Sequence, residues 1–446
     1  MRLFIRNGYI VDPLQGNEGV GSLIVEGGRI TGMRPGVSGA GPDGQDEPDS
    51  PATTESTVID ATGLHVLPGL IDLHAHLREP GFEFKETIRT GTAAAVRGGF
   101  TTVCCMPNTN PVNDNPSVTG FILNKTAEEG SCSVCPIGAI TKGQKGEELA
   151  EIGLMREAGC VGFSDDGRPV MSSLMMRRAL EYTKAFGVPV ISHCEDLSLS
   201  DGGVMNDGLL ATMLGLKGVP AEAEDIMVAR DILLARLTGG RVHIAHVSTA
   251  GSVALIRRAK EEGVTVTAET CPHYFSVTED AVQGYNTNAK VNPPLRTARD
   301  AEAIREGLRD GTIDIIATDH APHHSDEKLQ EFDKAPSGIS GFETALGLSL
   351  KLVHEGVLTW PELVEKMSLG PARILGLPRG TLKEGSEADI TIVDAGREFI
   401  VEPRSFISLG KNTPFGGWSL KGTPVITVCR GTVHALPPAG LPAGEA

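Results

Sequence analysis

Short apolar runs alternate with amphipathic stretches along the middle of the chain. Eight runs rich in apolar and β-branched residues lie at 67–74, 100–106, 133–140, 160–164, 188–192, 241–247, 264–269 and 313–318. Helical periodicity follows many of them, for example at 86–97, 173–185, 222–237, 251–262, 301–309 and 342–355. Strands that alternate with helices in this way predict an α/β protein with a (β/α)8 TIM-like barrel, whose active site lies at the C-terminal strand ends.

The two ends of the chain have a different pattern. Residues 1–35 alternate apolar and polar positions between glycine turns, and residues 380–402 and 422–435 again resemble short strands. Such strands predict one small β-sandwich module built from both chain ends. We therefore expect the module to span 1–66 and 376–446 and the barrel to span 67–375, with a flexible loop at 36–57 that is rich in Gly, Pro, Asp, Ser and Thr.

The charge balance narrows the classes of partner. With a formal net charge of −17, the chain lacks the clustered Lys and Arg that nucleic-acid binding requires. No apolar run is as long as a bilayer span, and Arg6, Asn7 and Asp12 interrupt any signal-peptide core at the start. We expect a cytoplasmic protein with no nucleic-acid or membrane partner, in which an anionic substrate would need a local positive island.

The eight cysteines do not have the spacing of a disulfide framework, and most lie in apolar runs. Cys132 and Cys135 form one C-x-x-C, which is the spacing of a redox pair or of half a zinc site. No second pair follows at zinc-finger spacing. We therefore expect reduced, buried thiols.

Metal-ligand residue types stand at the ends of several runs. His74 and His76 are two residues apart, so on a strand they point to the same face. The other runs end in Asp165-Asp166, His193, His246 and Asp319. Imidazoles and carboxylates suit zinc or a similar divalent ion, and six ligands exceed what one catalytic zinc uses. We expect two metals that share a bridging hydroxide, with Asp319 as both ligand and proton shuttle.

Other polar residues have simpler interpretations. His65 and His243 lie inside strand-like runs and are expected to be packed or hydrogen-bonded, whereas His273 and His324 are expected in loops that solvent can reach. Glu269 is interpreted first as a structural partner for a loop amide and second as a catalytic group.

Several motifs together resemble one enzyme family. The segment PGLIDLHAHLREPGFEFKETIRTGTAAAVRGGFTTVCCMPNTNP, with FSDDG, SHCED, HVSTAGS, NPPLR and ATDHAPH, is similar to the dihydroorotases of the amidohydrolase superfamily. The resemblance implies reversible hydrolysis of the cyclic amide of (S)-dihydroorotate to N-carbamoyl-L-aspartate, the third step of de novo pyrimidine synthesis. It covers the barrel, with looser agreement in the flanking module.

The resemblance also implies roles for individual residues. His74, His76 and Asp319 would hold one zinc, His193 and His246 the other, and Asp166 would bridge the two. Local pattern does not choose between Asp165 and Asp166, and the family motif selects the second. The dihydroorotate carboxylate would bind Arg78, Asn108 and His323, and the ring would bind Asn292 and the backbone of Ser337 and Gly338. His76 would also line the substrate site.

Two competing interpretations remain. A hydantoinase or allantoinase would keep the histidines but lack the set of Arg78, Asn108 and His323, and many such relatives carry a bridging carboxylated lysine that is absent after Phe163-Ser164. A non-catalytic barrel that only scaffolds aspartate transcarbamoylase would have lost metal ligands. The sequence leaves the assembly open between a homodimer and an aspartate transcarbamoylase complex.

Overall fold

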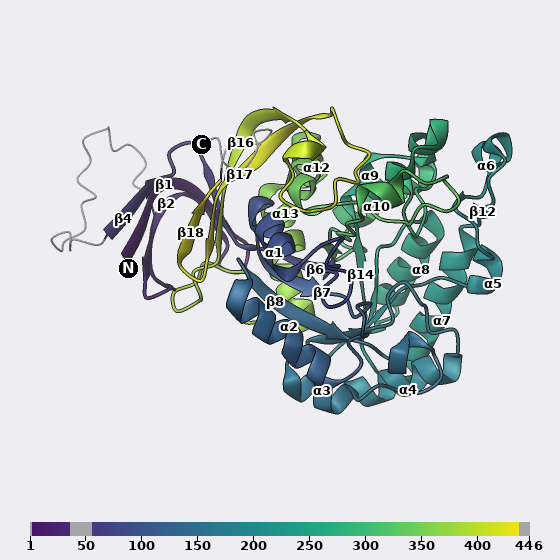
Figure 1. Ribbon diagram of the computed structural model, residues 1–446. Helices are drawn as coiled ribbons and strands as arrows, with labels where there is room; N and C mark the ends of the chain where they lie inside the picture. Colours follow the sequence, from purple (N-terminus) through teal and green to yellow (C-terminus); the bar gives the residue numbers. More distant parts are fainter. Residues whose placement is uncertain (1, 36–55, 437–446) are drawn as a thin grey trace.

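The computed structural model describes residues 2–35 and 56–436 (Figure 1). Most of the segment predicted as a flexible loop, 36–55, lies outside the described residues, and its last two residues begin strand β4 (Ser56–Asp60). Within the described ranges, no helix has the length and apolar character needed to cross a bilayer.

The predicted barrel is confirmed. Its eight strands pair in parallel and in chain order, from β6 to β15. They are β6 (Leu70–Ala75), β7 (Phe100–Cys105), β8 (Ser133–Gly138), β9 (Gly162–Ser164), β10 (Val190–Ser192), β13 (Val242–Ile244), β14 (Val266–Thr270) and β15 (Ile315–Ile316). A parallel bridge between Ala75 and His320 brings the last strand back to the first, so the sheet is nearly closed.

Helices follow the strands and cover the outside of the barrel (Figure 1). They include α1 (Ile88–Arg97), α2 (Pro116–Glu129), α3 (Ile152–Ala158), α4 (Ser173–Lys184), α7 (Glu222–Thr238), α8 (Ala250–Glu261), α10 (Ala298–Arg309) and α12 (Phe342–His354). Capping residues fix several starting points, because a Thr hydroxyl accepts a backbone N–H that the helix leaves without a partner. Thr87 does this for α1, Thr249 for α8 and Thr297 for α10.

Shorter elements fill the longer connections at the C-terminal side of the strands. After β10 come α5 (Leu197–Ser200), β11 (Met205–Asn206), α6 (Leu209–Leu214) and β12 (Gly218–Val219). After β14 come α9 (Pro272–Ser276), η2 (Glu279–Tyr285) and η3 (Thr287–Ala289), and after β15 comes α11 (Ser325–Lys328). Beyond α12, the chain forms α13 (Trp360–Val364), η4 (Glu365–Leu369) and α14 (Gly370–Leu375), and Ser368 of η4 donates to the carbonyls of Pro68 and Gly69 at the N-terminal side of the strands. A further turn, η1 (Lys142–Gln144), follows β8.

Both chain ends contribute to one separate sheet, as the sequence predicted. It contains β1 (Arg2–Asp12), β2 (Asn17–Glu26), β3 (Arg29–Pro35), β4, β5 (His65–Pro68), β16 (Ile390–Ile400), β17 (Ser419–Cys429) and β18 (Thr432–Ala435), with η5 (Pro403–Ser405) between β16 and β17. Strand β5 pairs with β1 and β16, so it joins the chain ends together. Figure 1 shows the purple and yellow strands of this sheet beside the barrel.

The barrel interior is packed below the strand ends. Leu73, Cys104, Ile137, Ile191 and Ile315 are buried there in one cluster. Side chains in adjacent layers fill such barrels completely, which leaves the C-terminal end as the place where polar groups can gather.

The cysteines are free, and all but Cys135 are buried. Cys132 belongs to the large cluster between sheet and helices, whereas Cys135 packs against the barrel interior and is the strand partner of Cys104. Since the two thiols of the C-x-x-C lie in different clusters, they do not form a shared metal site.

Candidate metal centre and substrate cavity

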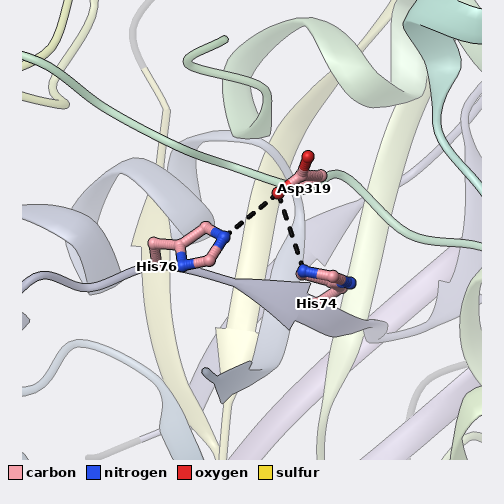
Figure 2. A group of neighbouring side chains, drawn as sticks. All are labelled: His74, His76 and Asp319. Atoms are coloured by element: carbon pink, nitrogen blue, oxygen red, sulfur yellow. Dashed lines mark hydrogen bonds and ion pairs between the residues drawn. The ribbon is translucent and has the colours of Figure 1, made fainter. Parts of the chain in front are cut away.

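Six predicted ligand side chains meet at the C-terminal strand ends. His74 lies in β6 and His76 directly after it, and Asp166, His193, His246 and Asp319 follow β9, β10, β13 and β15. Figure 2 shows His74 and His76 both pointing at Asp319. The Nε2 atoms of His76 and His74 lie 3.1 and 3.6 Å from Asp319 Oδ1. All six residues are buried.

Asp166 faces both halves of this cluster. Its Oδ1 lies 3.4 Å from His74 Nε2 and 3.5 Å from both His193 Nδ1 and His246 Nε2. Its Oδ2 lies 3.5 Å from His76 Nε2. One oxygen of this carboxylate therefore faces three histidines and the other faces His76, so Asp166 reaches both pairs, as a bridging ligand must.

The cluster has the spacing and the unmet bonding capacity of a metal site. Ligand atoms of His74, His76 and Asp319 lie within 4.8 Å of one another, and so do those of His74, Asp166 and His246. Ligands about 2.0–2.1 Å from a tetrahedral zinc are separated by ~3.4 Å. His74 Nε2 and Asp166 Oδ1 are buried without a hydrogen-bond partner, although burying an unpaired polar atom is costly. These nitrogen and oxygen donors fit a divalent cation.

Electrostatics keep the two aspartates ionised. Burial raises the pKa of Asp166, but the nearby histidines, His74 foremost, outweigh it and hold the pKa well below its usual value. Burial also raises the pKa of Asp319, but the hydrogen bond with His76 and the charges of the nearby histidines outweigh burial, so the pKa of Asp319 is lowered as well. Two buried carboxylates that remain charged favour a cation between them.

The adjacent Asp165 has a different environment. Its Oδ1 accepts the backbone N–H groups of Ile140 and Thr141 at 2.8 and 3.1 Å, and its Oδ2 accepts the Thr141 hydroxyl. Asp165 thus joins the ends of β8 and β9, while Asp166 faces the histidines.

Buried carboxylates behind the cluster orient its ligands. Glu269 Oε1 lies 2.6 Å from His74 Nδ1, and its Oε2 lies 3.2 Å from His243 Nε2. Since a carboxylate only accepts, His74 carries a proton on Nδ1, and its Nε2 is the atom that faces the cluster. Glu269 therefore mainly holds the imidazole of His74. The sequence-based interpretation of Glu269 as a partner for a loop amide applies only to its 3.3 Å contact with the backbone N–H of His246.

Asp72, which the sequence reasoning missed, joins the first and last strands. Its carboxylate accepts the backbone N–H and the hydroxyl of Thr318 at 2.9 and 2.5 Å, and the backbone N–H of His74 at 3.3 Å. It stands two residues before His74, the first of a predicted ligand pair, in an otherwise apolar run, which is the signal that could have found it.

The other histidines lie outside the cluster. His243 is hydrogen-bonded to Thr267 and Glu269, and His65 stacks on Trp360, as expected for packed side chains. His324 is exposed. The expectation of a solvent-accessible loop is wrong for His273, because it lies in helix α9 and is buried.

A cavity of about 360 Å³ opens above the cluster. It is lined by every predicted substrate residue, namely His76, Arg78, Asn108, Asn292, His323, Ser337 and Gly338. Glycine is required at the last position: its φ is +144°, and a Cβ there would lie 2.6 Å from the Ala321 carbonyl oxygen.

One part of the cavity wall is basic. Arg78 lines the cavity, where its Nε donates to the Pro322 carbonyl at 3.2 Å and its Nη2 lies 3.4 Å from His323 Nε2. His323 Nε2 donates to the Ser337 carbonyl at 2.8 Å, and Lys85 Nζ donates to His323 Nδ1 at 3.3 Å. Burial, and then the charge of Arg78, lower the pKa of His323, so its ring is neutral.

Asn108 and Asn292 connect the cavity wall to the cluster. Asn108 Oδ1 accepts from His76 Nδ1 at 2.9 Å. Asn292 Nδ2 donates at 2.9 Å to Glu195 Oε2, which also lies 3.0 Å from His193 Nε2. Glu195 was not singled out from the sequence, although it stands two residues after a predicted ligand.

The fold and this site define a metal-dependent hydrolase of the amidohydrolase type, and comparisons with known proteins agree. The fold is similar to L-hydantoinase (dihydropyrimidinase) from Arthrobacter aurescens, with a TM-score of 0.84, 26% identity, and 97% and 96% of the two chains covered. A D-hydantoinase structure has a TM-score of 0.83 at 23% identity, covering 99% and 96%, and shows likeness of fold alone.

Sequence relatives are more specific. A family model described as dihydro-orotase-like matches residues 63–252. The dihydroorotase of Geobacter metallireducens is 56% identical over 97% of this chain and 99% of its own, and that of Pelotomaculum thermopropionicum is 57% identical over 97% and 98%. The chain belongs to the dihydroorotase family.

Proposed function

We propose that this chain, a cyclic amidohydrolase by family, interconverts (S)-dihydroorotate and N-carbamoyl-L-aspartate in the third step of de novo pyrimidine synthesis. The observation that carries the proposal is that one cavity joins a basic wall to a cluster of six metal-type ligands, five of them in compact groups and His193 beside Asp166. Dihydroorotate has a carboxylate that suits the basic wall and a cyclic amide that suits the ligand cluster.

We propose that the cluster holds two zinc ions per chain. His74, His76 and Asp319 would hold one, His193 and His246 would hold the other, and Asp166 would bridge them. Bound divalent ions would activate water and polarise the amide carbonyl. The unpartnered atoms His74 Nε2 and Asp166 Oδ1 support this occupancy.

The basic wall would place the substrate. Arg78 can bind a carboxylate with two parallel hydrogen bonds because its guanidinium is planar and always charged. Asn108 and His323 line the same cavity and would bind the carboxylate with it, while Asn292 and the backbone of Ser337 and Gly338 would bind the ring. Holding the carboxylate there would set the ring amide against Asp319.

Asp319 would move the proton. In hydrolysis, water attacks the ring carbonyl carbon, Asp319 accepts a proton from that water, and the C–N bond breaks as Asp319 returns the proton to the leaving amide nitrogen. The nitrogen needs this proton because an amide anion is a poor leaving group. In ring closure Asp319 would accept the carbamoyl proton instead. Its lowered pKa supports the ionised form that hydrolysis requires at the start.

Three further proposals concern the context of the enzyme. The domains would divide at 1–66, 67–375 and 376–446. The chain would act in the cytoplasm, as a homodimer or within an aspartate transcarbamoylase complex. Light scattering of the purified protein, alone and mixed with the transcarbamoylase from the same cell, distinguishes these two assemblies.

A substrate comparison tests the proposed function. The zinc-loaded protein should hydrolyse dihydroorotate and should cyclise N-carbamoyl-aspartate, with far lower kcat/KM for hydantoin and dihydrouracil, which lack the carboxylate. Equal or better hydrolysis of the uncharged rings would assign the chain a hydantoinase activity instead. No hydrolysis of any ring by protein of full metal content would support the scaffold interpretation.

A further inference from the structure

Glu195 lies between the metal-ligand cluster and the substrate cavity, and neither proposal above gives it a role. It lines the cavity, and its side chain is 14% exposed. Its Oε2 is 3.0 Å from His193 Nε2 and 2.9 Å from Asn292 Nδ2. These two nitrogens lie 3.5 Å apart, which fits two donors that share one acceptor.

The chemistry of a carboxylate fixes both neighbours. A carboxylate has no proton to donate, so the amide atom of Asn292 that faces it is the NH2 group, and the Oδ1 atom must point elsewhere. The imidazole of His193 must carry a proton on Nε2 for the same reason, which leaves Nδ1 as the atom that faces the ligand cluster, 2.8 Å from His246 Nε2 and 3.5 Å from Asp166 Oδ1.

Asn292 itself lines the cavity. With its NH2 group held by Glu195, its free amide oxygen is an acceptor, and the ligand group that complements an acceptor is an N–H. Had Asn292 been free to rotate, it could equally have offered its NH2 group to a ring carbonyl. The orientation of one amide therefore decides which edge of a ring the site prefers.

We propose that Glu195 is a positioning residue that makes the site specific for a cyclic ureide with an unsubstituted ring N–H, by holding Asn292 as an acceptor and His193 as an Nδ1 ligand. This inference rests on the proposed function. Glu195 and Arg78, which carry opposite charges, both line the cavity. A substrate with a carboxylate at one end would be oriented by these two residues, because Glu195 repels the carboxylate and Arg78 attracts it.

Two substitutions of Glu195 separate its role as a hydrogen-bond acceptor from its negative charge. Glu195→Gln keeps an oxygen of the same reach that can accept from both neighbours, whereas Glu195→Leu fills similar space and accepts nothing. The substrates are dihydroorotate and its N1-methyl and N3-methyl derivatives. Zinc affinity, measured by competition with a chelating dye, is a readout that does not depend on turnover.

The wild type should prefer dihydroorotate over at least one methyl derivative. Glu195→Leu should reduce that preference at least ~10-fold and weaken zinc binding 10- to 100-fold, the range typical of lost partners behind metal ligands. Glu195→Gln should keep most of the substrate preference and most of the zinc affinity. Asn292→Leu should lose the same preference, and the double variant should lose no more than Asn292→Leu alone.

A well-folded Glu195→Leu protein with unchanged preference would overturn the inference, as would losses that multiply in the double variant. If Glu195→Leu does not fold, Glu195→Ala takes its place with the same expectations. A wild type that does not act on dihydroorotate refutes the proposed function, whereas an active wild type with insensitive variants refutes only the role of Glu195.

Discussion

Two walls of the same cavity are built in different ways. The ligand wall comes from barrel strand ends, and two of its atoms, His74 Nε2 and Asp166 Oδ1, are buried without a partner. The basic wall comes from loops, where Arg78 and His323 already donate to the carbonyls of Pro322 and Ser337. The strand ends thus hold two buried polar atoms without protein partners, whereas the loop groups already have such partners.

The difference shows where the chemistry and the recognition reside. Loss of the ligand wall should abolish turnover, because the reacting atoms meet there. Changes in the loop wall should mainly weaken binding, since its hydrogen bonds position a part of the substrate that does not react. The predictions below test this division, from the largest expected effect to the smallest.

Asp319→Asn should lower kcat by about 10²- to 10⁴-fold, the usual contribution of acid–base catalysis, because an amide cannot accept the proton of the attacking water. Steady-state kinetics in both directions give the effect. Metal content must be determined on the same samples, and only a variant with full metal content tests proton transfer. Near-normal kcat in such a variant would move the proton shuttle to another group.

Arg78→Ala should raise KM for dihydroorotate by roughly 10- to 100-fold, the value of a hydrogen bond to a charged group, with a smaller effect on kcat. Arg78→Lys is the matched control, because it keeps the charge but loses the planar fork, and should recover part of the loss. An unchanged KM in Arg78→Ala would remove Arg78 from carboxylate binding.

Glu269→Gln should weaken zinc binding by about 10- to 100-fold while leaving KM for dihydroorotate nearly unchanged, because Glu269 orients His74 and lies outside the cavity lining. Chelator competition and kinetics at saturating zinc measure the two quantities. A rise in KM without loss of zinc affinity would contradict the division between the walls.

The smallest expected effect concerns Lys328 and the pH dependence of the free energy of unfolding. It is 6% exposed and donates to the carbonyls of Pro336 and Gly338, next to the loop wall. Burial, and then the charge of Lys290, lower the pKa of Lys328 to about 7. Between pH 7 and the pKa of the unfolded side chain, the unfolded state binds more protons than the folded state, so this group makes stability rise with pH in that window.

Lys328→Met should remove that rise. The free energy of unfolding of the wild type should therefore increase between pH 7 and 9 relative to the variant, on the order of 1 kcal/mol. Urea unfolding at several pH values gives the comparison, and parallel pH curves for the two proteins would show that Lys328 titrates normally.

The sequence pattern predicted the ligand wall better than the loop wall, for a physical reason. Strand periodicity and the rule for barrel strand ends place His74, His76 and Asp319 together without any knowledge of relatives. Arg78, Asn292 and Ser337 lie in loops whose course no periodicity defines, so they could be assigned only through the resemblance. Glu195 and Asp72 were missed because their role depends on contacts with residues far along the chain.

Pairs of neighbouring residues mark the limit of local pattern. Asp165 and Asp166 are the same residue type at the end of one strand, but Asp165 accepts backbone N–H groups of the β8 connection and Asp166 faces four histidines. The exposure of His273 was misjudged for a related reason, since a five-residue helix after β14 is buried by segments distant in sequence.

The central claim is that hydrolysis of dihydroorotate needs both halves of the ligand wall to be occupied, with an aspartate as the bridge. The most direct test is to strip the protein of metal and titrate zinc back in degassed, bicarbonate-free buffer, measuring dihydroorotate hydrolysis at each step. The account predicts that activity rises until two zinc ions are bound per chain and needs no bicarbonate. Full activity with one ion or none, or a strict requirement for bicarbonate, would contradict it.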